Sequence, residues 1–218
     1  MLIALAAALG YSAWQNQGTK NNQSAAESSD FDFYVLALSW SPTFCVEQSG
    51  EDDKEQCSTG RPFAFVVHGL WPQNDRGFPS NCQSDFGSRI DGGIANKMLD
   101  IMPSRGLVFH QWRKHGTCSG LSPQDYFSFT REAKNKITVP DQFMKLADYK
   151  TIAPIEVERA FITANPTLQQ NAIAVTCSKR YLKEVRICMD KSLTFRPCPE
   201  VDAKSCRAAK TVMPPTRG

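Results

Sequence analysis

Apolar runs alternate with polar, glycine-rich and proline-rich segments along the chain, and each run has the length of a strand or a short helix. The stretch FDFYVLALSW at 31–40 carries aromatic and branched residues on both faces, which is typical of a central strand covered on both sides. Pro42 ends this strand because proline has no amide hydrogen for a sheet ladder. A second buried strand is predicted at 63–67, which places His68 at its carboxyl end.

Helical periodicity is predicted in four segments, at 94–102, 107–115, 121–137 and 155–165. The third has a complete start signal. Ser122 stands at the N-cap, Pro123 at the first helical position and Asp125 in the first turn. The fourth ends at Asn165, which proline follows.

The last third of the chain alternates apolar and polar residues, which predicts strands at 171–177, 180–189 and 193–198. Two segments, 46–61 and 72–93, are predicted to be irregular loops, the first closed by Cys45 and Cys57. Strands and helices do not alternate regularly. The expected fold class is therefore α+β, with a central, mainly antiparallel β-sheet packed with helices and stabilised by disulfides.

The length of 218 residues fits one domain with a short extension. A hydrophobic content of 41% and a charged content of 22% argue against global disorder, and a net charge of +3 is too small to identify a polyanionic partner. The first residues, MLIALAAALGYSA, are similar to the apolar part of an export signal, and a polar linker follows to about Asp30. We expect 1–30 to be an export signal or anchor plus a disordered linker, and 31–218 to be a single domain.

The chain has eight cysteines, an even number, and no two of them are spaced as a CxxC pair. This pattern favours disulfides in an oxidising compartment, and thus an exported protein of the periplasm or the extracellular medium. Buried thiols of a cytosolic protein are the alternative. Spacing alone does not choose the pairing.

The three histidines lie in two short stretches. His68 stands in FVVHGLWPQN, while His110 and His115 stand in HQWRKHGTC. On a helix, His110 and Lys114 are four residues apart, as are Gln111 and His115, so one side would present imidazole, amide and ammonium groups together. An ordinary solvated face is one interpretation. A zinc site is disfavoured because the spacing of the histidines is awkward, no carboxylate adjoins them and Lys114 would repel the ion, so no metal or other cofactor is expected.

These residue types match one reaction, the cleavage of a phosphodiester by a neighbouring hydroxyl. The reaction needs a base for the hydroxyl proton and an acid for the leaving oxygen, and imidazole serves both purposes because its ordinary pKa is ~6.5. A fixed cation such as Lys114 can stabilise the negative charge that gathers on the phosphate oxygens.

FVVHGLWPQ and HQWRKHGTC resemble the two signature segments of the ribonuclease T2 family of secreted, metal-independent ribonucleases. The likeness extends to LSWSPTFC, GTCSGLSPQDYF and VTCSKRYLKEVRICMDKSLTFRPCP, and covers about 33–206. The resemblance implies an endoribonuclease that cleaves single-stranded RNA through a 2′,3′-cyclic phosphate to 3′-phosphate ends. DNA would not be cleaved, because it lacks the 2′-hydroxyl.

The resemblance also implies roles for the histidines of both signatures and for Lys114. His115 would be the general base, His68 the general acid, Lys114 the cation that stabilises the transition state, and His110 a phosphate ligand. The family often has a glutamate where this chain has Gln111. We expect Gln111 to position the phosphate and activity to persist.

Base recognition is implied at an aromatic pair. Trp71 would offer a stacking face, Phe78 a second aromatic ring, and Gln73 a polar contact to the base edge. Trp71 could instead be core filler. Leu107 stands where the family often has an aromatic residue, so low base specificity is expected.

The resemblance further implies the disulfides Cys82–Cys118, Cys177–Cys206 and Cys188–Cys198, which leaves Cys45–Cys57. The expected partner is RNA as substrate, and the expected state is a monomer. A catalytically inactive ribonuclease-like protein that binds RNA or another partner is the alternative function. A secreted structural or inhibitor protein is a third, but it leaves the histidines unexplained.

Overall fold

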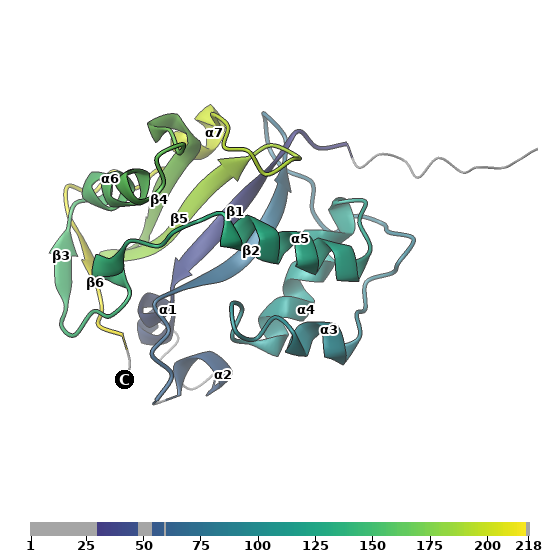
Figure 1. Ribbon diagram of the computed structural model, residues 1–218, viewed down its shortest axis with the longest axis horizontal. Helices are drawn as coiled ribbons and strands as arrows, with labels where there is room; N and C mark the ends of the chain where they lie inside the picture. Colours follow the sequence, from purple (N-terminus) through teal and green to yellow (C-terminus); the bar gives the residue numbers. More distant parts are fainter. Residues whose placement is uncertain (1–29, 48–53, 59, 217–218) are drawn as a thin grey trace, which may run out of the picture.

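The computed structural model describes residues 30–47, 54–58 and 60–216 (Figure 1). The expected export segment and almost all of the linker lie outside the described residues. Within them, the chain forms a six-stranded sheet with helices on both sides. None of the described helices is long and apolar enough to cross a membrane.

The strands are β1 (Phe33–Trp40), β2 (Phe65–Gln73), β3 (Lys150–Ile152), β4 (Ile173–Ser178), β5 (Tyr181–Met189) and β6 (Thr211–Met213). The α-helices are α1 (Ser41–Glu47), α2 (Lys54–Cys57), α3 (Gly92–Asn96), α4 (Arg105–Lys114), α5 (Pro123–Asn135), α6 (Pro154–Ala164) and α7 (Pro199–Asp202). The strand order is β2-β1-β5-β6-β3, with β4 paired to β5. Every described strand pairing is antiparallel except β5 with β6, so the expected α+β class with a mainly antiparallel sheet is confirmed.

Several local expectations are confirmed and others are wrong. The Ser122 hydroxyl caps α5 by accepting a hydrogen bond from the Asp125 amide, and Asn165 ends α6 as predicted. Strand β1 ends before Pro42 as predicted, and Pro42 lies in the first turn of helix α1. Helix α2 interrupts the expected loop 46–61. Segment 193–198 forms only one bridge, from Phe195 to Met189, because a turn precedes it and helix α7 begins at Pro199. The predicted helix 94–102 is only five residues long and starts at Gly92.

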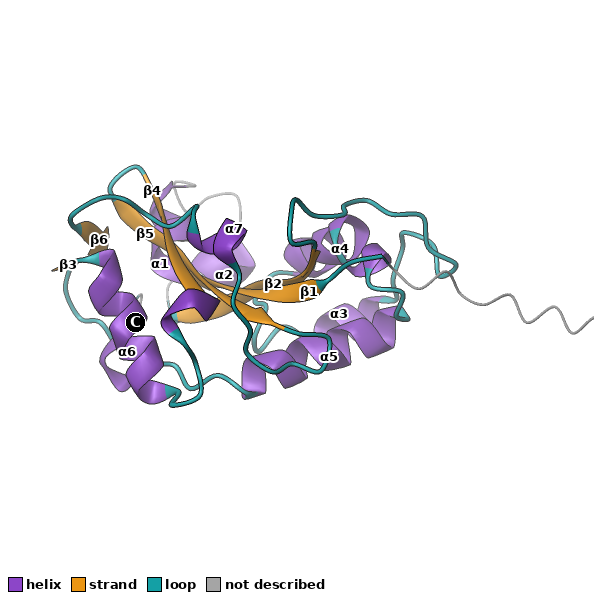
Figure 2. Cartoon of the chain, turned by 90° about the horizontal axis from the view of Figure 1, so that it is seen from above, coloured by secondary structure: helices purple, strands orange, loops and turns teal. Residues whose placement is uncertain are grey.

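The two faces of the sheet differ. On β1, Leu36 and Leu38 belong to the large apolar cluster that packs against α4, α5 and α6. Val35 points to the opposite face and joins a small cluster with Cys188 and Val201 of α7. Figure 2 shows α5 and α6 along one side of the strands and α7 on the other. The face with the smaller cluster is the one left free for a cavity.

A β-bulge places His68 on that free face. Ala37 of β1 pairs with Gly69, but the next residue, Leu38, pairs with Val67, so His68 is an extra residue in β2. A bulge re-aims one side chain without reversing the rest of the strand. His68 was expected at a strand end. It lies instead in mid-strand, because β2 continues to Gln73.

The four disulfides pair as the resemblance implied, and no cysteine is free. Cys82–Cys118 joins the loop after β2 to the turn after α4, so it ties together the two segments that carry the histidines. Cys188–Cys198 joins β5 to the start of α7. Both bridges limit how far the walls of the free face can separate.

Candidate active site

A cavity of about 260 Å³ opens on the free face of the sheet, between β2, β5 and α4. The structure brings together there all eight residues that were predicted to act on or bind the substrate. They are His68, Trp71, Gln73, Phe78, His110, Gln111, Lys114 and His115. Residues up to 47 positions apart in the sequence thus share one surface, which a merely solvated helix face would not require.

Helix α4 presents one wall of this cavity. Its N-cap is Ser104, whose hydroxyl accepts a hydrogen bond from the Leu107 amide. Val108 and Trp112 are buried in the core and hold one face of the helix inward. The helix ends at His115, and Gly116 follows because a Cβ there would lie 2.4 Å from the Trp112 ring.

His115 is almost enclosed, with 5% of its surface exposed. Its ring lies against Trp71, with centroids 5.3 Å apart and planes 28° from parallel. Burial, together with the positive charge of Lys114, lowers the pKa of His115 to about 3. Nδ1 is buried and has no hydrogen-bond partner among the described residues. The neutral ring can therefore exchange a proton with a substrate only through Nε2.

His68 has the opposite kind of environment. Its Nδ1 lies 2.6 Å from Oε1 of Glu184, and its ring meets Trp71 edge-on at 5.3 Å. A carboxylate oxygen only accepts a hydrogen bond, so Nδ1 carries a proton here. Nε2 is the other nitrogen of this partly exposed ring.

Glu184 and Arg186 of β5 also line the cavity, and the sequence analysis did not single them out. Glu184 is 1% exposed, and its Oε2 accepts hydrogen bonds from Nε and Nη2 of Arg186 at 3.0 and 2.8 Å. Burial by itself raises the pKa of Glu184, but the hydrogen bond and charge of His68 and the charge of Arg186 outweigh it and lower the value to about 2. Residues two positions apart in a strand point to the same face. The spacing of Glu184 and Arg186 was therefore the sequence signal that could have placed them together.

Gln111 faces inward rather than toward solvent, with 1% exposure. Its Oε1 accepts a hydrogen bond from Trp71 Nε1 at 2.8 Å. Gly69 makes this contact possible, because a Cβ at that position would lie 2.1 Å from Oε1 of Gln111 and 2.5 Å from Nε1 of Trp71.

Trp71 is the shared neighbour of both histidines. Its ring packs against His115 and His68, and the guanidinium carbon of Arg186 lies over it at 5.2 Å from the centroid. Trp71 is therefore part of the framework of the cavity. Its role as a stacking face for a base stays a prediction.

Phe78 lies at the mouth of the cavity and is 51% exposed. The preceding amide, that of Gly77, donates a hydrogen bond to Oε2 of Glu200 in α7 at 2.8 Å. This contact holds the loop close to the pocket, where Gln73 at the end of β2 also lies.

A second cavity of about 260 Å³ lies on the other side of His68, lined in part by Ser39, Phe44 and Leu107. His68, Lys183 and Glu184 line both cavities. His68 thus lies between two cavities, each large enough to hold part of a nucleotide.

The model of the ribonuclease T2 family matches residues 31–198. The chain belongs to the ribonuclease T2 family. Among its relatives, a ribonuclease of Aeromonas hydrophila is 35% identical over 176 residues, which cover 79% of this chain and 78% of the relative. As a member of this family, the chain is an RNA-cleaving enzyme.

Solved structures of other T2-type ribonucleases share the fold. Trichomaglin, described as a novel S-like ribonuclease, superposes with a TM-score of 0.70 at 23% identity, covering 87% of this chain and 100% of trichomaglin. RNase NT, solved in complex with 5′-AMP, has a TM-score of 0.65 at 25% identity, covering 85% of this chain and 99% of that structure. Within the described part of this T2 ribonuclease, no group of three or more His, Cys, Asp or Glu side chains is placed to hold a metal ion.

Proposed function

We propose that this ribonuclease cleaves single-stranded RNA with low base specificity, by attack of the 2′-hydroxyl on the adjacent phosphate and without a metal ion. One observation carries the proposal. Two imidazoles face one cavity in contrasting environments, His115 enclosed and held neutral, and His68 hydrogen-bonded to a buried carboxylate. Such contrasts separate a general base from a general acid.

In the first step, Nε2 of His115 takes the proton of the 2′-hydroxyl, and the 2′-oxygen forms a bond to phosphorus. The bond from phosphorus to the 5′-oxygen breaks, and His68 protonates that oxygen from Nε2. The products are a 2′,3′-cyclic phosphate and a free 5′-hydroxyl. In the second step water attacks the cyclic phosphate with the two imidazoles in exchanged roles, which yields a 3′-phosphate.

The remaining groups on α4 act on charge and position. Lys114 lines the cavity and supplies the cation that stabilises the charge developing on the phosphate oxygens. His110 is exposed beside it and would bind the phosphate. Gln111 is engaged with Trp71, so it positions the ring on which His115 packs, and its amide nitrogen is the part available to a phosphate oxygen.

Low base specificity follows from the chemistry of the cavity mouth. Trp71 and Phe78 offer aromatic faces to any base, since every base has a π-face. Gln73 can both donate and accept a hydrogen bond, so it does not select one base edge.

The four disulfides support export to the periplasm or the extracellular medium, where such bonds persist. We further propose that 31–218 is one ribonuclease domain that acts as a monomer, and that 1–30 carries the export signal or anchor.

The test is to incubate the oxidised protein with RNA and with matched DNA in excess EDTA, beside His115→Ala. Cleavage of RNA to cyclic-phosphate ends, absent on DNA and absent in the variant, is the expected result. Cleavage that requires an added divalent ion would refute the metal-free mechanism. A stable complex with RNA and no turnover between mildly acidic and neutral pH would support the inactive binding protein.

A further inference from the structure

Glu184 differs in charge from the other ionised residues that line the cavity between β2, β5 and α4. Among the described residues that line it, Glu184 is the one carboxylate, while Lys114, Lys183, Arg186 and Lys204 supply positive charge. It also lines the second cavity together with His68. A carboxylate is an unfavourable lining for a site that binds phosphate, so its presence beside His68 requires a reason.

We propose that Glu184, clamped by Arg186, is a positioning residue that fixes the imidazole of His68 with Nε2 directed at the leaving oxygen and places a negative charge beside the ring. The inference rests on the proposed function, in which His68 is the general acid. It adds a carboxylate on strand β5 to a site whose helix α4 carries the amide of Gln111 where the family often has glutamate.

The first part of the argument is geometric. An imidazole can rotate by half a turn about its Cβ–Cγ bond, which exchanges Nδ1 with Cδ2 and Nε2 with Cε1 with little change in shape. The hydrogen bond of 2.6 Å from Nδ1 to Oε1 of Glu184 selects one of these orientations. Glu184 cannot itself turn away, because Arg186 holds its other oxygen through two nitrogens and the side chain is 1% exposed.

The second part is electrostatic. Around His68, strand β5 contributes Lys183, Glu184 and Arg186, and α1 contributes Glu47 to the second cavity. The positive and basic groups of α4 are His110, Lys114 and, at its end, His115. Most of these groups are positive or basic and repel positive charge near His68. Glu184 is the negative charge in direct contact with the ring, so it opposes them.

The third part concerns stability. A buried ion pair loses hydration, and an apolar pair of similar size is often at least as stabilising. Glu184 and Arg186 lie on the free face of the sheet, away from the large apolar cluster. Stability alone therefore does not explain why both charges are kept beside the histidine.

The test compares two substrates that need different amounts of acid catalysis. A diribonucleotide has an alkoxide leaving group that must be protonated, whereas uridine 3′-(p-nitrophenyl phosphate) releases a stable phenolate. In Glu184→Gln, we expect kcat on the diribonucleotide to fall by about 10- to 100-fold and kcat on the aryl ester to change by less than about threefold.

Two further variants separate positioning from general damage to the fold. Glu158→Gln alters another buried carboxylate, which accepts a hydrogen bond from the Val175 amide outside both cavities, and should change neither rate. Arg186→Gln keeps the carboxylate but releases its clamp, and should give a smaller loss with the same preference for the aryl ester. The inference would be overturned if Glu184→Gln lowered kcat equally on both substrates, or lowered it on neither.

Nitrogen NMR of labelled histidine gives a readout that does not depend on turnover. The wild-type protein should show the proton of neutral His68 on Nδ1, and Arg186→Gln should show a mixture of the two tautomers. A mixture already present in the wild type would refute the positioning role. Failure of the wild type to cleave either substrate would instead refute the proposed function, and the NMR result would still decide the state of His68.

Discussion

The cavity has two sides that use the same side chain differently. On the strand side, formed by His68, Glu184 and Arg186, the imidazole is partly exposed and hydrogen-bonded to a carboxylate. On the helix side, formed by α4 and His115, the imidazole is enclosed and a lysine adjoins it, and its Nδ1 has no hydrogen-bond partner within the part of the chain that the structure describes. The strand side places a carboxylate against its imidazole, whereas burial on the helix side holds its imidazole neutral. The difference shows how one residue type can supply both an acid and a base.

Trp71 connects the two sides. It packs against His115, meets His68 edge-on, lies under Arg186 and donates a hydrogen bond to Gln111. A change on one side can therefore reach the other through one rigid ring, and the predictions below test each side and the link between them.

The largest expected effect is the loss of either imidazole. His115→Ala should lower kcat/KM by about 10³- to 10⁴-fold on both a diribonucleotide and an aryl ester, since both require the 2′-hydroxyl to lose its proton. His68→Ala should give a comparable loss on the diribonucleotide alone. Steady-state kinetics on the two substrates measures this. A similar pattern for both variants would contradict the division into an acid side and a base side.

Gly69→Ala should break the link between the two sides. The new Cβ would overlap Oε1 of Gln111 and crowd Nε1 of Trp71, and Gln111 is too buried to move aside. We expect kcat to fall by about 100-fold, because displacement of catalytic groups by about 1 Å has costs of this order. The matched control is Gly106→Ala on α4, where the nearest atom is Ser104 Oγ at 3.7 Å. Equal activity of the two variants would show that the contact is dispensable.

Gln111→Ala should have a smaller effect of about tenfold on kcat, because the Trp71 indole loses its acceptor while the ring stays packed. Gln111→Glu keeps an acceptor for the indole and should retain more activity than Gln111→Ala. Turnover of diribonucleotides by the three proteins checks this order. No loss in the alanine variant would mean that Gln111 does not contribute.

The pH dependence should reveal the helix side directly. The pKa of His115 is lowered to about 3 by burial, so the ring is neutral at mildly acidic pH and the acidic limb of kcat/KM should lie near that value. The lowered pKa of His115 also makes the folded protein less stable as the pH falls. His115 protonates more readily in the unfolded chain, so its contribution is complete above the ordinary pKa of ~6.5 and is lost as the pH falls toward about 3. Proton NMR of the His115 ring measures the midpoint, and a value near 6.5 would contradict this environment.

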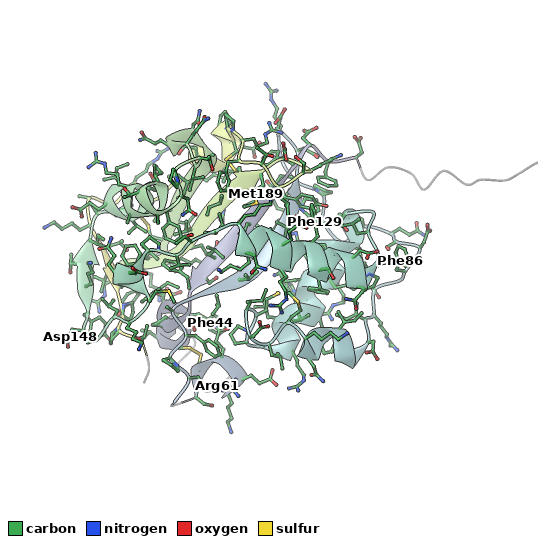
Figure 3. All side chains as sticks on the ribbon, viewed as in Figure 1. Phe44, Arg61, Phe86, Phe129, Asp148 and Met189 are labelled. Carbon is green, nitrogen blue, oxygen red and sulfur yellow. A yellow bond between two sulfur atoms is a disulfide. The ribbon has the colours of Figure 1, made fainter. Side chains whose placement is uncertain are left out.

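The smallest expected effect is at the cavity mouth. Phe78→Ala should raise KM for a dinucleotide by about fivefold or more and leave kcat nearly unchanged, because stacking adds about 1–3 kcal/mol per base. Phe86→Ala is a close control. Phe86 is equally exposed at 51%, projects from the same loop at the outer edge of the molecule in Figure 3, and lines neither cavity. If both variants had the same KM, Phe78 would not be part of the base site.

The sequence alone determined the parts of this protein whose signals are local. The start of α5 at Ser122, the strand β1 and the end of α6 follow from side chains within a few residues of each feature. The two histidine segments were recognisable because each is contiguous in the chain. Their likeness to a known family then supplied both the disulfide pairing and the expectation that the segments face each other, neither of which spacing could provide.

Only the tertiary structure decided how the environments of the two imidazoles differ. The bulge at His68 depends on the register between β1 and β2, and Glu184 meets His68 across 116 residues of sequence. Strands β3 and β6 are three residues each and exist through their pairing rather than through any pattern of their own. Burial, which lowers the pKa of His115, is a property of the surroundings of a side chain. A contact or an environment formed by distant segments leaves no mark in the residues beside either partner, and the chain has to fold before it exists.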